Sequence, residues 1–196
     1  MTDYSYLTVT EVAKLIRKAL KEASPGDKFS VRSSKYAGGS SIDISWTDGP
    51  TEDQVRELAS KFEGSYFDGS IDYKGSKYHT LDGEPVSILC DYIFYRHESS
   101  EAALTTAIIA AVMHYGAFNV PTVEDFKTGH SCNTTPIGNA QGEPNWSWSN
   151  IIRRTIEKKE DWTESPPGLL PSPTAERIQS AGDDGYGQGR TGRVSA

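Results

Sequence analysis

The chain has 196 residues, of which 36% are hydrophobic, and a formal net charge of −7. This length suits one domain, or one domain with an extension, and the apolar content is enough for one core. No apolar run is long enough to span a bilayer, and residues 1–20 lack the basic start and apolar stretch of a secretory signal. Two cysteines without CxxC spacing exclude a disulfide scaffold. We therefore expect a cytoplasmic protein that does not engage membranes.

The negative charge is concentrated in one part of the chain. Residues 47–101 carry 12 acidic and 5 basic side chains, whereas residues 1–46 carry 7 basic and 5 acidic ones. An acidic segment can be a solvated face, or it can contact a basic groove of another protein. Because duplex DNA carries about one charge per 1.7 Å of its axis, a segment charged this sparsely does not imitate DNA over its whole surface.

The apolar spacing predicts a defined order of helices and strands. The first helix has the clearest signal, because Thr8 and Glu11 form a capping box and apolar side chains follow at helical spacing. Strands are predicted where apolar and polar residues alternate, or where β-branched and aromatic residues are dense. In chain order the predicted elements are a helix over 12–23, strands over 28–32 and 41–46, a helix over 55–62, a strand over 86–96 and a helix from 101 to about 115.

This order is typical of an α+β fold with a small antiparallel sheet and helices packed on one face. Residues 65–85 have weak periodicity and are predicted to be a loop, with short strands near residues 66–67 and 77–79 as the alternative. Residues 1–116 would form the domain, and residues 117–162 a C-terminal extension with a short helix near 150–159. Residues 163–196 contain 6 Gly and 4 Pro and few large apolar side chains, so we expect a disordered tail there.

The connection between the first two predicted strands, residues 33–40 with Arg32 before them, is the first candidate site. Arg32, Lys35 and Tyr36, with backbone that is open to approach at Gly38 and Gly39, are components of a nucleic-acid contact. Cations meet phosphates in such contacts, and a ring stacks on a base. The alternative is an ordinary long hairpin whose glycines permit the turn.

Acidic residues interleaved with tyrosines form the second candidate site. Tyrosine buries a large area at low entropic cost, so acidic loops that carry tyrosines suit protein binding. The carboxylates match no calcium loop, and a solvated acidic surface is the alternative. The predicted protein-binding residues are Tyr66, Asp68, Asp72, Tyr73, Tyr78, Asp82 and Glu84.

No pattern of catalytic or metal-binding residues stands out. The four histidines form no HxH or HExxH motif and no pair with cysteine at zinc-finger spacing. His130 and Cys132 lie two residues apart, but nothing around them marks a thiol nucleophile. Cys90, in the predicted third strand, is expected to be a small buried apolar residue. We expect no catalytic residue, cofactor or metal ion, and a binding protein rather than an enzyme.

One stretch carries a resemblance to a known family. The run over residues 28–51, KFSVRSSKYAGGSSIDISWTDGPT, follows the helix at 11–20 and precedes Phe-Glu-Gly at 62–64 and Phe-Asp-Gly at 67–69. Together they resemble the large polyvalent protein-associated domains, specifically number 29 of that series, over roughly residues 8–100. That family offers no established catalytic residues to transfer. The resemblance implies a phage or conjugative-element protein, a context in which counter-defence functions are common.

Two hypotheses follow from the residues and the resemblance. The first is a non-catalytic counter-defence protein that binds and inhibits a host defence complex, such as a CRISPR effector or a restriction enzyme. The second is a nucleic-acid-binding accessory domain that uses the hairpin at residues 32–40. The expected partner is accordingly a host defence protein or nucleoprotein, with nucleic acid as the alternative.

Overall fold

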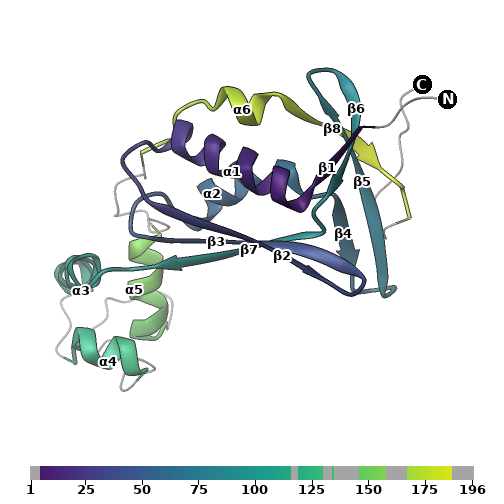
Figure 1. Ribbon diagram of the computed structural model, residues 1–196. Coiled ribbons are helices and arrows are strands. Elements are labelled where there is room, and N and C mark those ends of the chain that lie inside the picture. The colour runs from purple at the N-terminus through teal and green to yellow at the C-terminus, as the bar shows by residue number, and fades with distance from the viewer. Residues whose placement is uncertain (1–4, 116–118, 130–133, 135–145, 158–166, 187–196) are drawn as a thin grey trace. The chain divides into compact units, whose positions relative to one another are not determined.

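The computed structural model describes residues 5–115, 119–129, 134, 146–157 and 167–186 (Figure 1). These residues form an α+β fold, as predicted. The elements in chain order are β1 (Ser5–Thr8), α1 (Val9–Ala23), β2 (Phe29–Tyr36), β3 (Gly39–Thr47), α2 (Glu52–Ala59), η1 (Ser60–Phe62), β4 (Ser65–Asp68), β5 (Tyr73–Leu81), β6 (Glu84–Leu89), β7 (Tyr92–Glu98), α3 (Glu101–Tyr115), α4 (Val123–Thr128), α5 (Trp148–Ile156), α6 (Pro173–Glu176) and β8 (Ile178–Asp183). None of the helices described is long and apolar enough to cross a membrane.

The strands form two mixed sheets, which corrects the prediction of one antiparallel sheet. One sheet has the order β1-β6-β5-β4 with β8 also paired to β5, and the other has the order β2-β3-β7. β1 runs parallel to β6, whereas β5 is antiparallel to β4, β6 and β8. In the second sheet β2 and β3 are antiparallel. The Asp91 N–H donates to the Ser40 carbonyl and the Asp48 N–H to the Glu98 carbonyl, which sets β7 parallel to β3.

The second sheet arises because the predicted strand over 86–96 is broken. It is two strands, β6 and β7, which lie in different sheets and are separated by Cys90 and Asp91. The Cys90 carbonyl accepts the Gly64 N–H at 2.7 Å, and the Asp91 N–H donates to the Ser40 carbonyl at 3.1 Å. The backbone thus changes partners within two residues. Periodicity does not reveal this change, because β-forming residues are dense on both sides of it.

Two predicted connections are also shorter than expected. β2 ends at Tyr36 and β3 begins at Gly39, so only Ala37 and Gly38 connect them. The predicted connection over 33–40 is therefore wrong. The short strands named near residues 66–67 and 77–79 lie within β4 and β5, but these strands are longer than expected and, with the start of β6, occupy most of the predicted loop over 65–85. Asp82 and Gly83, with φ of 54° and 86°, make the two-residue turn between β5 and β6.

Helix α1 confirms the predicted capping box and lies over the sheet β2-β3-β7. The Thr8 hydroxyl accepts the Glu11 N–H, and the Glu11 carboxylate accepts the Thr8 N–H at 2.8 Å. α1 and α2 cover one face of this sheet (Figure 1). The fully buried Ile16 and Leu20 of α1 pack in the same core as Ile42 and Ile44 of β3. Burial of such side chains contributes about 1.5–3 kcal/mol each.

The chain divides into two compact units. The first comprises Met1–Trp46, Glu52–Arg96 and Gly168–Ala196, and the second comprises Thr47–Thr51 and His97–Pro167. In the second unit, α3 and α5 share a core that includes Ile108, Trp148 and Ile151. The short helix predicted near 150–159 corresponds to α5.

The C-terminal segment is ordered over residues 167–186, where we expected a disordered tail. It contains α6 and β8, while residues 163–166 and 187–196 lie outside the described part of the chain. The Glu22 carboxylate of α1 accepts the hydroxyl protons of Ser172 and Thr174, both at 2.8 Å. Ile178 is buried in the main core. Distant partners therefore order a segment whose own composition is poor in apolar residues.

Candidate binding site

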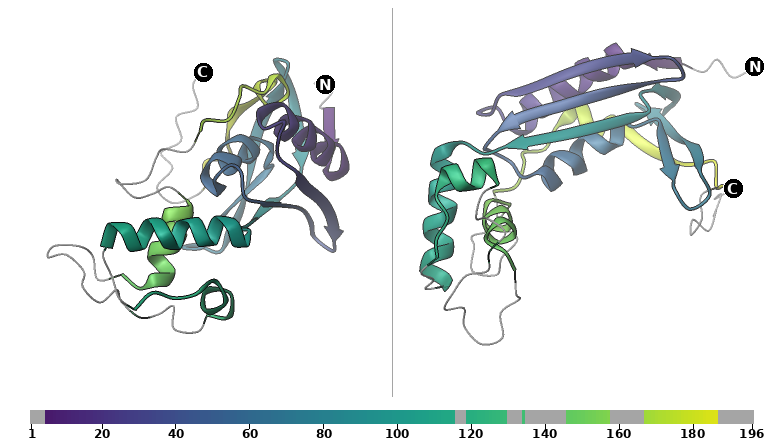
Figure 2. Two further views of the ribbon diagram at one scale, coloured as in Figure 1. Left: turned by 90° about the vertical axis from the view of Figure 1, so that its left-hand side faces the viewer. Right: turned by 90° about the horizontal axis from the view of Figure 1, so that it is seen from below.

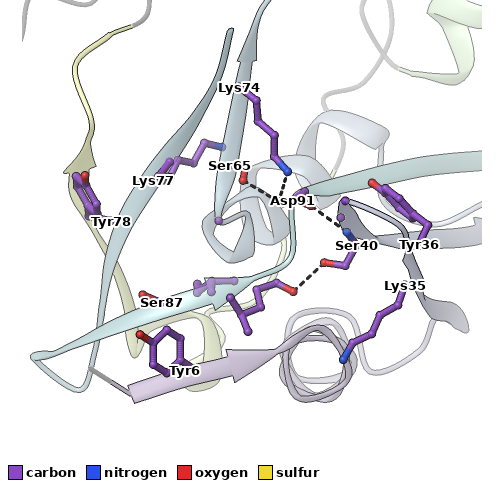
Figure 3. A pocket seen from close by; sticks show the side chains of 16 residues that line it. Tyr6, Lys35, Tyr36, Ser40, Ser65, Lys74, Lys77, Tyr78, Ser87 and Asp91 are labelled. Atoms are coloured by element: carbon purple, nitrogen blue, oxygen red, sulfur yellow. Dashed lines mark hydrogen bonds and ion pairs between the residues drawn. The ribbon is translucent and has the colours of Figure 1, made fainter. Parts of the chain in front are cut away.

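A pocket of about 590 Å³ lies in the first unit, where β1, β5 and β6 meet the hairpin of β2 and β3 (Figure 3). Three tyrosines, three lysines, several serines and the backbone of three glycines line it. Its volume is within the range typical of small-molecule sites. We call it the tyrosine–lysine pocket, and its side chains used below are Tyr6, Lys35, Tyr36, Ser40, Ser65, Lys74, Lys77, Tyr78 and Asp91.

Asp91 organises one wall of the tyrosine–lysine pocket. Its Oδ2 accepts the Ser40 N–H at 2.9 Å, and its Oδ1 accepts the Ser65 hydroxyl proton at 2.9 Å. The same Oδ1 lies 2.8 Å from the Lys74 Nζ. Burial acts to raise the pKa of Asp91, but Lys74 and the hydrogen bonds from Ser40 and Ser65 outweigh it and lower this pKa. Asp91 is therefore an ionised link between strands (Figure 3).

Glycines allow the strands around Asp91 to approach closely. A Cβ on Gly39 would lie 2.5 Å from the Asp91 Oδ2 and 2.8 Å from the Tyr36 ring. A Cβ on Gly64 would lie 1.9 Å from the Ile88 carbonyl oxygen. Gly38 has a φ of 88° in the turn of the hairpin. The structure thus gives Gly38 and Gly39 conformational and packing roles, which favours the ordinary-hairpin interpretation for these two residues.

The lysines give the pocket a positive lining. Lys74 is paired with Asp91, and the Lys77 Nζ lies 2.8 Å from the carboxylate of Glu63, outside the lining. Lys35 is exposed, and its ammonium group has no hydrogen-bond or ion-pair partner among the residues that the structure describes. Because Asp91 and Glu63 neutralise Lys74 and Lys77, Lys35 supplies the unpaired positive charge of the lining. The pocket therefore favours an anionic ligand or an acidic surface.

The tyrosines expose much of their rings at the pocket. The exposed fractions are 63% for Tyr6, 52% for Tyr36 and 51% for Tyr78. Leu89, which also lines the pocket, is 48% exposed. A tyrosine combines a large apolar face with a polar hydroxyl, and this combination is enriched where proteins bind other molecules.

The predicted nucleic-acid residues are only partly brought together. Lys35, Tyr36, Gly38 and Gly39 line the tyrosine–lysine pocket. Arg32 does not, because it lies on β2 and faces the side of the sheet that lines a different hollow. Arg32 and Lys35 lie three residues apart in β2, so their side chains point to opposite faces of the sheet.

Three of the seven predicted protein-binding residues contact the C-terminal segment. Tyr66 is buried and its hydroxyl donates to Asp184, while the Tyr73 hydroxyl donates to the same carboxylate at 3.0 Å. Asp82 pairs with Arg177 through both carboxylate oxygens. These three residues hold the C-terminal segment.

The other four have different surroundings. Asp68 accepts the Ser70 N–H at 2.9 Å within the turn between β4 and β5. Asp72 and Glu84 are exposed, and Tyr78 lines the pocket. Sequence reasoning missed Tyr6, Lys74, Lys77 and Asp91 as pocket residues, since no local pattern links positions that only the sheet brings together.

The thiol and imidazole groups of the described residues lie away from the pocket lining. Burial raises the pKa of the Cys90 thiol to about 12, which keeps it protonated. Burial also lowers the pKa of His79, whose Nδ1 has no hydrogen-bond partner. His130 and Cys132 lie outside the described residues. Within the described residues, no group of three or more His, Cys, Asp or Glu side chains could hold a metal ion.

Comparison with known proteins gives one match. Residues 7–100 match the family described as Large polyvalent protein associated domain 29, in agreement with the resemblance seen in the sequence. The matched region contains every lining residue of the tyrosine–lysine pocket except Tyr6, whereas α6 and β8 lie beyond it. No curated protein and no solved structure matches the chain significantly.

Proposed function

Because residues 7–100 match the large polyvalent protein associated domain 29 family, which is typical of polyvalent phage and mobile-element proteins, we propose that the chain is a counter-defence protein. It binds a host defence complex, such as a CRISPR effector or a restriction enzyme, and inhibits it without catalysis. The observation that carries this proposal is the set of half-exposed tyrosines at the tyrosine–lysine pocket.

These tyrosines have the properties of binding anchors. Tyr6, Tyr36 and Tyr78 come from three different strands, yet all of them line one concave surface. Residues that dominate the affinity of protein interfaces are enriched in tyrosine and sit in well-packed pockets. Strands hold their backbones in place, so little conformational freedom of the chain is lost when a partner binds.

The charges support a partner that carries both signs. The pocket lining is positive, whereas Asp72 and Glu84 are exposed at the two turns that flank β5. A defence nucleoprotein offers phosphates for the lysines and basic grooves for the carboxylates. Complementary charges of this kind raise the association rate and select among partners.

Co-elution with purified defence complexes tests the proposal. The full chain is mixed with a CRISPR effector bound to its guide, or with a restriction enzyme on its DNA, and passed through a size-exclusion column while DNA cleavage is measured. We expect co-elution and loss of cleavage, and loss of both effects in the double variant Tyr36→Ala, Tyr78→Ala. Met113→Ala, which removes an 81% exposed apolar side chain of the second unit, is the matched control. The proposal would be rejected if the chain neither co-elutes with any of these complexes nor inhibits them.

Nucleic-acid binding is the second candidate function, and Lys35 is the observation that favours it. Its ammonium group has no partner among the described residues, and it lines the same pocket as Tyr36, Lys74 and Lys77. Binding of this kind weakens steeply as salt increases. A gel shift with the isolated chain that is lost in Lys35→Ala would support this function. A shift that is equal in this variant, or absent from the parent protein, would reject it.

A further inference from the structure

The helices α1 and α2 leave one face of the sheet β2-β3-β7 uncovered (Figure 2, right). A second hollow, of about 440 Å³, lies on this face. Side chains of all three strands form it. We call it the sheet groove, and its side chains used below are Arg32 and Ser34 from β2, Asp43 and Ser45 from β3, and Phe94 and Arg96 from β7.

The groove follows from side-chain size on neighbouring strands. The central strand β3 contributes the short Asp43 and Ser45, whereas β2 contributes Arg32 and β7 contributes Phe94 and Arg96. Long side chains on the outer strands therefore flank short ones in the middle. Since neighbouring strands lie about 4.8 Å apart, the backbones of β2 and β7 are about 10 Å apart, a spacing that suits one extended strand.

The groove contains two cationic side chains that form no ion pair with the residues described. Arg32 and Arg96 are exposed, and neither guanidinium group forms a hydrogen bond or an ion pair with the residues described. Arg32 lies opposite Asp43 in the strand register, yet no ion pair joins them. Phe94 stands beside these groups with 55% of its surface exposed. Two free guanidinium groups, an open ring and a carboxylate thus share one hollow.

We propose that the sheet groove binds a nucleotide unit of single-stranded nucleic acid. The Phe94 ring stacks on the base, and the guanidinium groups of Arg32 and Arg96 hold the flanking phosphates. The Asp43 carboxylate accepts a hydrogen bond from an exocyclic amino group of the base, the type of group that carboxylates read on cytosine. This site is separate from the tyrosine–lysine pocket and does not depend on the proposed counter-defence function.

A nucleic acid fits the groove better than an acidic peptide does. Both carry negative charge that the arginines would attract. The carboxylates of a peptide would be repelled by Asp43 on the floor of the groove, whereas a base brings amino groups to the same position. A base also offers a flat face to the exposed Phe94 ring, as in sheet-based recognition of single strands.

Fluorescence anisotropy of a labelled single-stranded oligodeoxycytidylate, titrated with the full chain, tests the assignment. We expect binding that weakens with salt, and a Kd raised about 10-fold or more by Phe94→Ala, because loss of base stacking has effects of this order. Phe94→Tyr should restore binding. The double variant Arg32→Ala, Arg96→Ala should reduce the slope of log K against log salt by about 1.4. Lys61→Ala, which removes an exposed cation outside the groove, should have no effect.

Further competition and variant experiments distinguish this site from other binding sites and ligands. Free dCMP that displaces the strand would assign the groove to single nucleotides, and failure to displace it would assign the groove to strands, so both results keep the proposal. Equal displacement by polyglutamate would overturn it. No binding by the parent chain, or binding that is lost in Lys35→Ala but kept in both groove variants, would also overturn it. Since the groove side chains are exposed, unchanged circular dichroism verifies the fold of each variant.

Discussion

Replacement of Asp91 by alanine tests how the tyrosine–lysine pocket is held together. The Asp91 carboxylate accepts the Ser40 N–H and the Ser65 hydroxyl proton, each at 2.9 Å, and it pairs with Lys74 at 2.8 Å. Ser40 and Ser65 are 8% and 9% exposed, so water has little access to the donors that the substitution leaves unpaired. A buried donor without a partner costs about 1–3 kcal/mol.

The magnitude follows from the exposure of each partner. The Lys74 side chain is 41% exposed, so the ion pair itself contributes no more than about 1 kcal/mol. The two unpaired donors account for most of the lost stability, and hydrogen bonds to water in the open pocket restore part of it. We expect Asp91→Ala to lower the free energy of unfolding by about 2–3 kcal/mol, a fall in Tm of about 4–12 °C for a chain of this size.

Urea denaturation followed by circular dichroism measures this difference. Lys74→Ala should lower the free energy of unfolding by less than about 1 kcal/mol, and Glu84→Ala, at an exposed position, by less than about 0.5 kcal/mol. Because the pKa of Asp91 is lowered in the folded state, its stabilisation is present above its unfolded pKa of about 3.9. It is lost as the pH falls through the folded pKa. Equal losses in Asp91→Ala and Lys74→Ala, or a loss in Asp91→Ala below about 0.5 kcal/mol, would refute the reasoning.

Three further predictions concern other contacts. Gly64→Ala should abolish the cooperative thermal transition seen by circular dichroism, because its Cβ would lie 1.9 Å from the Ile88 carbonyl oxygen; a native-like transition would contradict this. Although burial lowers the pKa of His97, the hydrogen bond and charge of Glu157 together with the contact to Asp48 outweigh burial and raise it. The difference in free energy of unfolding between the parent chain and His97→Ala should thus be largest below the unfolded pKa of His97, about 6.5, and decline as the pH rises through the folded pKa. A difference that does not change with pH would disprove this. In a Cys132→Ser variant, iodoacetamide should alkylate Cys90 only after unfolding, since its pKa of about 12 keeps the native thiol protonated; rapid native alkylation would argue against this.

Local signals in the sequence predicted the elements that depend on local contacts. The Thr8–Glu11 capping box is present in the structure, and α3 spans the predicted residues. The turn at Asp82 and Gly83 carried a recognisable signal, since Asp-Gly favours two-residue hairpin turns, and with this signal the strands on either side could have been predicted.

Features that depend on distant contacts could not be predicted in this way. Nothing near Cys90 and Asp91 indicates that the chain changes sheets there, because the partners that cause the change are Ser40 and Gly64. The order of the C-terminal segment likewise depends on Glu22, about 150 residues away in the sequence. The two hollows are assembled from strands that are paired across the sheets, so Arg32 was grouped with Lys35 although the two line different surfaces.

We propose that the chain inhibits a host defence complex by binding it, without catalysing a reaction on it. The most direct measurement is a titration of the full chain into a fixed amount of CRISPR effector or restriction enzyme, with the rate of DNA cleavage as the readout. We predict that cleavage stops when about one chain is bound per complex, and that the inhibited fraction does not increase with longer incubation. Complete inhibition by a small fraction of one chain per complex, growing with time, would contradict the claim because it would require catalysis.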